Sequence, residues 1–269
     1  PTTLTLSLAH FHLHLPHATS PNPPYDHHPP PQNPAPATIE PPPTLTLLIT
    51  QTTPLPDTPT AATIDADAGN DQCADSNGNC SLRAAVMEAN ALGAPVIIIL
   101  PKGTYTLTRT SSIDEQGDDL DLKSNITLRG DDRDATILDG NNATRVVQVY
   151  SGKTAVLENL TVQRAPQSAS AVRNDGGSLT LKDVVVKNNG YGVDNNGTAT
   201  LTNVTISGNG TGCSNYFGTA TLTNVTISGN STTSSNGGGG IYNGGGTLKI
   251  AFSNITNKNA QRGGGVGIY

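Results

Sequence analysis

The sequence lacks tryptophan, and only 4% of its 269 residues are aromatic and 13% are charged, against about 25% charged residues in ordinary globular domains. No apolar run reaches the roughly 18 residues that a membrane-spanning helix requires. No lysine or arginine precedes Arg83, and the net charge is −6. The chain therefore has no basic patch for a nucleic-acid partner, and we predict neither a transmembrane segment nor nucleic-acid binding.

Catalytic residue types are also scarce. No histidine follows His28, which excludes the usual histidine-based hydrolytic sites from the rest of the chain. No carboxylate follows Asp194, so this part cannot supply the carboxylate pair, roughly 5–10 Å apart, that a glycosidase needs. Most other carboxylates of the later chain gather at 114–121 and 131–139, which we interpret as turns. The sequence favours a protein without catalysis, and a calcium-dependent polysaccharide lyase or glycosidase is the alternative.

Proline and glycine are segregated along the chain. Sixteen of the 19 prolines lie in the first 59 residues, and all 29 glycines lie at Gly69 or later. A proline-, threonine- and histidine-rich segment buries too little apolar area to offset its ordering entropy, so we predict disorder over 1–60. Residues 61–95 are expected to form a cap, and 96–269 a repetitive β-region that is cut short at its C-terminal end.

Three cysteines are present, and two of them bracket a polar loop, CADSNGNC. A disulfide between Cys73 and Cys80 would suit an exported protein. Two free thiols or half of a metal site are the alternatives, although the spacing is a poor zinc signal without further ligands. The sequence assigns no role to Cys213.

Four aspartates precede and enter this loop. Asp65, Asp67, Asp71 and Asp75 are oxygen ligands at spacings that a calcium loop uses. The glutamate that closes an EF-hand loop is missing. We therefore favour a solvated acidic turn, with calcium as the only cofactor that the sequence suggests.

A short amphipathic helix is predicted over 81–92. Ser81 is a suitable N-cap residue, and Gly93 and Pro95 end the helical pattern. The apolar residues recur at helical spacing: Leu82, Ala85, Val86 and Ala89.

The stretch GTATLTNVTISGN occurs twice, at 197–209 and 218–230, which gives a period of 21 residues. Apolar and polar residues alternate in it as in a half-buried strand. The alternation slips once, at Asn203, and asparagine enters the left-handed backbone region more readily than most residues. One unit is therefore predicted as strand, asparagine bend, strand and glycine/asparagine turn.

The same bend is predicted along the chain, at intervals of 34, 24, 20, 21 and 30 residues. A unit of 20–24 residues cannot bury its own apolar face, so copies must stack. We predict an all-β fold, a right-handed single-stranded parallel β-helix capped by the short helix, in which the bend residues form a ladder. The predicted bend residues are Asn125, Asn159, Asp183, Asn203, Asn224 and Asn254.

The motif CSLRAAVMEAN resembles the CSLREA motif of bacterial secreted proteins, with Ala84 where that motif has glutamate. The resemblance continues through VIIILPKGTYTLT and LDLKSNITLRGDDRDATILDGNN, and GGGGIYNGG resembles the repeats of polymorphic outer-membrane-type and pectate-lyase-like β-helix proteins. It covers roughly residues 60–269. It implies a right-handed parallel β-helix that is secreted or displayed at a cell surface, and it implies no catalytic residues.

The predicted surface offers two further features. Tyr216 and Phe217 lie in a turn between repeats, and exposed aromatic side chains are typical of carbohydrate-binding surfaces. The threonines of the doublet would stack into a flat array, which is also the form of an ice-binding surface. We therefore expect an adhesin-like or structural module whose partner is a polysaccharide or a host or neighbouring cell surface, with ice binding as a minor alternative.

Overall fold

The computed structural model describes residues 45–48, 63–108, 118–231, 239–256 and 266–268. The described strands form three parallel sheets, one of eight strands and two of seven. Sheet A contains β1 (Leu45–Leu48), β2 (Val96–Leu100), β5 (Ile126–Gly130), β8 (Thr154–Glu158), β11 (Ser178–Lys182), β14 (Thr198–Thr202), β17 (Thr219–Thr223) and β20 (Thr247–Ala251). Sheet B contains β3 (Gly103–Thr106), β6 (Thr136–Asp139), β9 (Thr161–Gln163), β12 (Val185–Lys187), β15 (Thr205–Ser207), β18 (Thr226–Ser228) and β21 (Asn254–Thr256). Sheet C contains β4 (Leu120–Leu122), β7 (Val147–Val149), β10 (Ser170–Asn174), β13 (Tyr191–Asn195), β16 (Thr211–Asn215), β19 (Ile241–Asn243) and β22 (Val266–Ile268).

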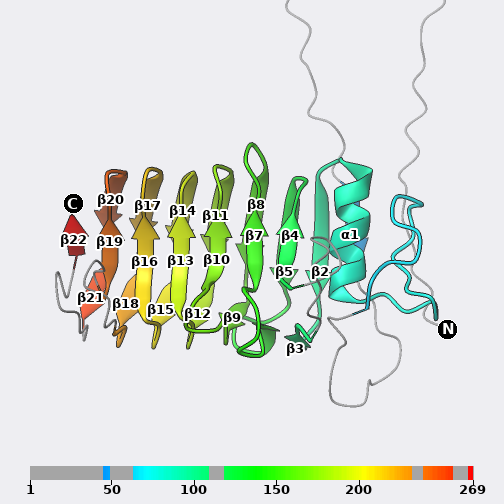
Figure 1. Cartoon of the computed structure of the whole chain (residues 1–269), viewed down its shortest axis with the longest axis horizontal. Helices are drawn as coiled ribbons and strands as arrows, with labels where there is room; N and C mark the ends of the chain where they lie inside the picture. Colours follow the sequence, from blue (N-terminus) through cyan, green and yellow to red (C-terminus); the bar gives the residue numbers. More distant parts are fainter. Residues whose placement is uncertain (1–44, 49–62, 109–117, 232–238, 257–265, 269) are drawn as a thin grey trace, which may run out of the picture.

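Consecutive strands pass from sheet A to B to C and back to A, so the chain winds as a β-solenoid (Figure 1). From β8 to β20, paired sheet A strands are 24, 20, 21 and 28 residues apart in sequence (Thr154, Ser178, Thr198, Thr219 and Thr247 in register). The predicted parallel β-helix is therefore confirmed. The predicted unit was incomplete, because each turn contains a third strand, in sheet C, where the sequence suggested only a turn.

The segment 1–60, predicted to be disordered, contains one described element. Residues 45–48 form β1, which pairs in parallel with β2, Leu45 opposite Val96. The rest of that segment lies outside the described residues.

The core consists of columns of identical or similar side chains, one per turn. In sheet A, leucine repeats from β5 to β17, and in sheet B, valine gives way to isoleucine. Parallel in-register pairing places each residue directly above its counterpart, about 4.8 Å away. The best-defined column is Leu128, Leu157, Leu181, Leu201 and Leu222, all fully buried.

The predicted bend lies between sheets A and B, and four of its six predicted residues occupy it. Asn159, Asp183, Asn203 and Asn224 have φ between 54° and 57°. The Asn224 Nδ2 donates to Asn203 Oδ1 at 2.7 Å, and the Asn203 Nδ2 donates to Asp183 Oδ1 at 3.0 Å. The ladder is confirmed from Asp183 to Asn224, whereas the Asn159 Nδ2 donates to the Gly130 backbone oxygen at 2.9 Å.

The prediction is wrong at Asn125 and Asn254. Asn125 precedes β5, and its Oδ1 accepts a hydrogen bond from the Thr154 amide at 2.9 Å. Asn254 lies inside β21, opposite Thr226. Because Ala251 pairs with Thr223, the next residue, Phe252, takes the bend with φ 51° and is 90% exposed. Register with the preceding turn, not residue type, sets the bend.

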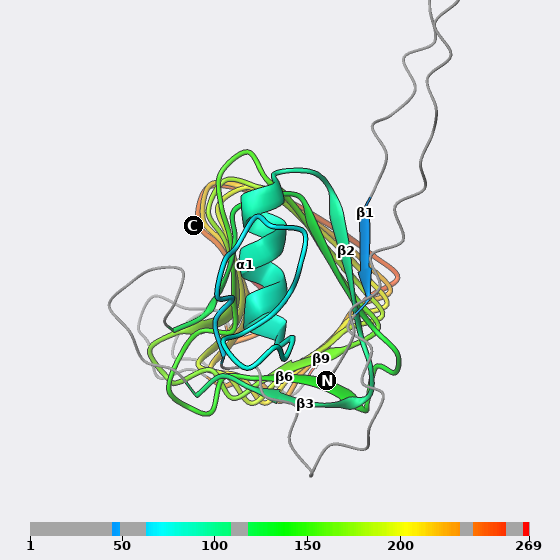
Figure 2. The ribbon, with the colours of Figure 1, turned by 90° about the vertical axis from the view of Figure 1, so that its right-hand side faces the viewer.

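The helix α1 (Leu82–Leu92) closes the N-terminal end of the coil, across which it lies in Figure 2. Its bounds confirm the prediction. The Ser81 Oγ accepts a hydrogen bond from the Ala84 amide at 3.1 Å, and Gly93 ends the helix with φ 66°. Ala84, where the resembled motif has glutamate, is fully buried.

Two polar side chains fasten α1 to the first turn. Arg83 is 2% exposed and donates to the backbone oxygens of Asp118 at 2.7 Å and Asp119 at 2.9 Å. The Asn90 side chain donates to the Asp121 oxygen at 2.8 Å and accepts from the Lys123 amide at 2.9 Å. Without α1, these backbone groups at the first turn would be exposed at the edge of the coil and available for pairing with another chain. The hydrogen bonds from Arg83 and Asn90 satisfy them.

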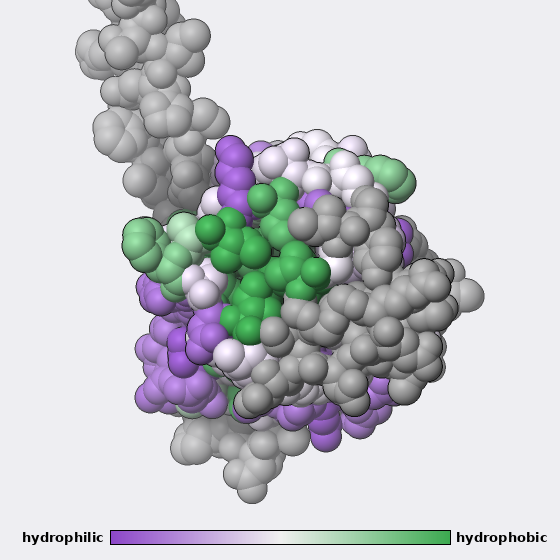
Figure 3. All heavy atoms as spheres, turned by 90° about the vertical axis from the view of Figure 1, so that its left-hand side faces the viewer, coloured by the Kyte–Doolittle hydropathy of each residue, from purple (hydrophilic) through white to green (hydrophobic). Residues whose placement is uncertain are grey.

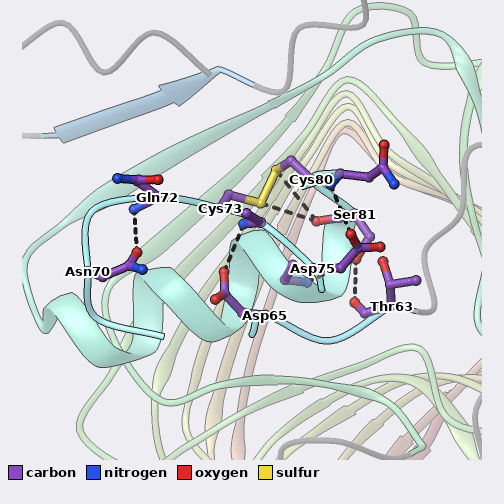
Figure 4. The surroundings of a disulfide bond; sticks show 11 residues. Thr63, Asp65, Asn70, Gln72, Cys73, Asp75, Cys80 and Ser81 are labelled. Carbon is purple, nitrogen blue, oxygen red and sulfur yellow. Dashed lines mark hydrogen bonds between the residues drawn. A yellow bond between two sulfur atoms is a disulfide. The ribbon is translucent and has the colours of Figure 1, made fainter. Parts of the chain in front are cut away.

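The loop before α1 is closed by a disulfide between Cys73 and Cys80, with a Cα–Cα distance of 5.1 Å (Figure 4). The buried Glu88 side chain holds the same loop, because its two oxygens accept the amides of Gly69 at 2.6 Å and Asp71 at 2.7 Å. The predicted cap therefore forms one unit, tied covalently and by a carboxylate that accepts backbone hydrogen bonds.

Two further asparagine ladders lie inside the coil, where the sequence indicated none. In the first, each Nδ2 donates to the Oδ1 of the next turn at 2.6–2.8 Å, and all four residues are buried: Asn174, Asn195, Asn215 and Asn243. The second runs between sheets B and C through Asn189, Asn209 and Asn230 at 2.9–3.0 Å. A Cβ on Gly218 would lie 2.4 Å from the Asn195 Nδ2, so glycine is required beside the ladder.

The C-terminal end of the coil exposes apolar side chains (Figure 3). Ile250 is 41% exposed, whereas Leu222, its counterpart one turn earlier, is fully buried. Val266 is 37% exposed. Among the described residues nothing at this end corresponds to the helix that covers the N-terminal end.

Candidate functional site on sheet C

The outer face of sheet C carries a connected group of polar and aromatic side chains. Gln148 in β7, Arg173 in β10 and Asp194 in β13 share one register position. Their strand neighbours, such as Val172 and Asn174, are fully buried and point into the coil, so these three face outward. We call the following group the sheet C site: Asp119, Arg145, Gln148, Arg173, Asp175, Asp194, Tyr216, Phe217 and Tyr242.

Most charges of the site are paired with one another. The Arg173 Nε donates to Asp175 Oδ1 at 2.7 Å, and the Gln148 Nε2 donates to Asp175 Oδ2 at 3.1 Å. Arg145 donates to Asp119 Oδ2 at 3.1 Å and also to Gln148 Oε1. Burial raises the pKa of Asp119, and the charge of Arg145 opposes the shift. Both oxygens of Asp175 are therefore occupied.

Asp194 differs from these carboxylates. Its Oδ1 is buried and accepts no hydrogen bond from the described residues. Burial raises the pKa of Asp194 above its ordinary value, and the nearby charges of Arg173 and Asp175 act in opposite directions on it. A buried oxygen without a partner costs free energy, so the burial of this Oδ1 is not compensated within the described residues, whereas the Asp194 side chain as a whole is half-buried.

Three aromatic side chains lie in the two turns of the coil that follow Asp194. The rings of Tyr216 and Tyr242 have centroids 5.2 Å apart and are tilted by 57°. Tyr216 follows Ser214 by two residues, and Ser214 is in register with Asp194. Burial raises the pKa of Tyr216, and the charge of Asp194 adds to the shift. Phe217 is 82% exposed. The predicted pair Tyr216 and Phe217 is thus placed on the surface, beside a third ring that the sequence did not single out.

Replacing Asp194 with asparagine should stabilise the protein near neutral pH by about 1 kcal/mol, because the substitution removes a charge whose burial is unfavourable. The raised pKa means that the folded state binds a proton more tightly than the unfolded state. The gain is therefore full above the raised folded pKa of Asp194, declines as the pH falls through it, and vanishes below the ordinary aspartate pKa. Urea denaturation near pH 7 and about pH 3 measures it. The exposed Asp67→Asn is the control, and an Asp194→Asn gain that persists at acid pH would contradict the assignment.

The four aspartates of the cap do not form a metal site. The described residues contain no group of three or more side chains that could hold a metal ion. Asp65 accepts the amides of Asp67 at 2.9 Å and Ala74 at 3.2 Å, and Asp75 accepts those of Asn77 and Asn79. The alternative of a calcium loop at Asp65, Asp67, Asp71 and Asp75 therefore finds no support in the described residues. The favoured acidic turn is solvated at Asp67 and Asp71, whereas Asp65 and Asp75 are buried and hold the turns of their own loop.

The threonine array on sheet A is longer than the doublet suggests. In its central column threonine is uninterrupted over three turns, at Thr180, Thr200 and Thr221, and Val156 separates these from Thr127. The neighbouring column is charged in its first three turns, at Arg129, Glu158 and Lys182, and Lys249 follows Thr221 in the central column. The interpretation as an ice-binding surface stays a prediction.

Cys213 belongs to the core. It is fully buried in register with Val193 and Ile241, and burial raises the pKa of its thiol to about 12. The thiol therefore fills space in the column and takes no part in the sheet C site.

Sequence analysis did not predict most of the sheet C site. The strands of sheet C contain many Gly, Ser and Asn residues, and a low β-propensity hides such strands in the sequence. A comparison of the sequences of successive turns indicates that sheet C differs from sheets A and B. The two identical 13-residue copies form the sheet A and B strands of successive turns, whereas YGVDN in β13 and TGCSN in β16 differ. Variation confined to one sheet of a repeated scaffold marks the face where function can differ.

These features define a β-solenoid with a helical, disulfide-closed cap and one outer face of paired charges and aromatic rings. Comparison of the chain with models of protein families, with curated proteins and with solved structures finds no match. Within the described part of the chain, no helix has the length and apolar character to cross a membrane.

Proposed function

We propose that the chain is an exported β-solenoid, secreted or displayed at a cell surface, that acts as a rigid, adhesin-like module without catalysis. The Cys73–Cys80 disulfide supports export, because such bonds persist in oxidising compartments. The resemblance to secreted CSLREA-motif proteins points the same way. Its partner would be a polysaccharide or a host or neighbouring cell surface.

The observation that carries the absence of catalysis is the pairing of the carboxylates along the coil. Arg129 binds Glu158, and Arg164 and Gln163 bind Asp139 at 2.7 and 2.9 Å. Asp175 and Asp119 are bound as described above. A glycosidase needs two carboxylates free to exchange protons or to attack the sugar. In the sheet C site Asp194 is the one carboxylate to which no described side chain donates a hydrogen bond, and one carboxylate cannot fill both roles.

The test is an assay of the purified chain against pectin, alginate and neutral polysaccharides, with and without added calcium. We expect retention of the protein on at least one polysaccharide and no release of reducing or unsaturated sugars. Sugar release that is lost in Asp194→Asn would instead support the calcium-dependent lyase or glycosidase. Thermal hysteresis of the same sample, with no binding to polysaccharide, would assign the function to the threonine array.

A further inference from the structure

The aromatic part of the sheet C site is built from two successive turns. Tyr216 and Phe217 follow β16, and Tyr242 lies in β19, where it pairs with Ser214. Figure 1 shows β13, β16 and β19 side by side. Ser214 faces outward but is only 2% exposed, so neighbouring side chains cover it. Tyr216 and Tyr242 are in contact, with ring centroids 5.2 Å apart, and Phe217 follows Tyr216 directly in the chain, in the turns after Asp194.

Two glycines make room for these rings. A Cβ on Gly244 would lie 2.7 Å from the Tyr242 ring, so only glycine lets that ring lie along the surface. A Cβ on Gly245 would lie 3.9 Å from the Phe217 ring, which places Phe217 over the backbone of the next turn. The Phe217 side chain is nevertheless 82% exposed, which leaves most of its apolar surface open to a ligand.

We propose that Tyr216, Phe217, Tyr242 and Asp194 form a subsite for a neutral pyranose unit of a polysaccharide, an inference that rests on the adhesin-like function proposed above. The C–H face of a pyranose ring is apolar and packs on an aromatic ring, while its hydroxyls need hydrogen-bond acceptors. The half-buried carboxylate of Asp194, which is in register with Ser214 two residues before Tyr216, supplies the acceptor on the outer face of sheet C.

The charges beside the rings decide against an acidic sugar. Asp175 and Asp194 carry two negative charges, and Arg173 carries the one positive charge between them. The Nε of Arg173 is already bound to Asp175 at 2.7 Å. A uronate would bring a further carboxylate toward a surface with excess negative charge. A neutral sugar brings hydroxyl groups without a charge, and these hydroxyls can donate hydrogen bonds to the Asp194 carboxylate.

The test uses affinity electrophoresis and calorimetry of the full chain with dextran, mannan, galactomannan and β-1,3-glucan as neutral probes. Alginate and polygalacturonate are the charged comparators. We expect binding to at least one neutral probe and weaker binding to both uronates. Because Phe217 is exposed, Phe217→Ala should fold normally and lower the affinity for the neutral probe at least tenfold.

Phe252→Ala is the matched control, because Phe252 is equally solvent-exposed but lies at the bend between β20 and β21. It should leave the affinity unchanged. Equal binding by Phe217→Ala and the wild type, or a preference for uronates, would overturn this subsite while leaving the adhesin-like function in place. Failure of the wild type to bind any probe would overturn this subsite and the polysaccharide partner of the proposed function. Release of sugars by the wild type would overturn the function without catalysis as well.

Discussion

Replacing Asn195 with alanine is expected to lower the free energy of unfolding by about 3 to 4 kcal/mol, at about 1 kcal/mol for each buried hydrogen bond lost. The Asn195 Nδ2 donates to Asn215 Oδ1 at 2.7 Å and to the Gly197 oxygen at 3.0 Å, and its Oδ1 accepts from Asn174 at 2.8 Å and from the Gly197 amide at 3.3 Å. The residue is fully buried, so water cannot replace these partners. Urea denaturation measures the change.

Asn203→Gly is the matched control on the exposed ladder. Asn203 also bonds to the turns before and after it, through Asp183 and Asn224. Water can satisfy those exposed groups, and glycine keeps the left-handed backbone, where φ is 57°. We expect a loss below about 1 kcal/mol. If both variants lost the same free energy of unfolding, burial would add nothing to the stabilisation that the asparagine ladder provides.

Replacing Arg83 with methionine should destabilise the protein by about 3 kcal/mol and loosen the cap. The guanidinium holds two backbone oxygens at the first turn, and removing a buried charged donor leaves those oxygens unsatisfied. Hydrogen exchange should therefore accelerate in α1 and β2 before it does in the later turns. Lysine can bind only one of the two oxygens, so the stability of Arg83→Lys should lie between that of the wild type and that of Arg83→Met.

The control for this substitution is Arg133→Met. Arg133 lies 3.8 Å from Asp134, which is largely exposed, and exposed ion pairs contribute little. If Arg83→Met cost no more than Arg133→Met, the cap would be held by its apolar contacts and the disulfide alone.

The features that could be predicted from the sequence depend on the preferences of individual residues for a backbone conformation. Helix α1 was predicted because Ser81 and Gly93 mark its ends through their own backbone and side-chain preferences. The bends at Asn159, Asp183, Asn203 and Asn224 were predicted because each residue type tolerates the left-handed region. The failures at Asn125 and Asn254 share a cause, since pairing with the neighbouring turn sets the position of the bend.

The same distinction applies to the candidate site. Tyr216 and Phe217 were identified from the sequence because they lie in a turn between two repeats, where aromatic side chains are expected to be exposed. A comparison of the turns points to sheet C but does not place Arg173, Asp194 and Tyr242 beside them, because Asp194 is one turn from Arg173 and two turns from Tyr242, and each is 20 or more residues from the next in sequence. Only the stacking register places them on one surface.

By itself the sequence determined the period, the alternation, the capping helix and hence the coiled architecture, because these depend on residue preferences over a few positions. The tertiary structure decided the third strand of each turn, the buried asparagine ladders and the sheet C site. These depend on hydrogen bonds between neighbouring turns, and an asparagine gains a partner in the ladder only when the turn above it has been stacked in register.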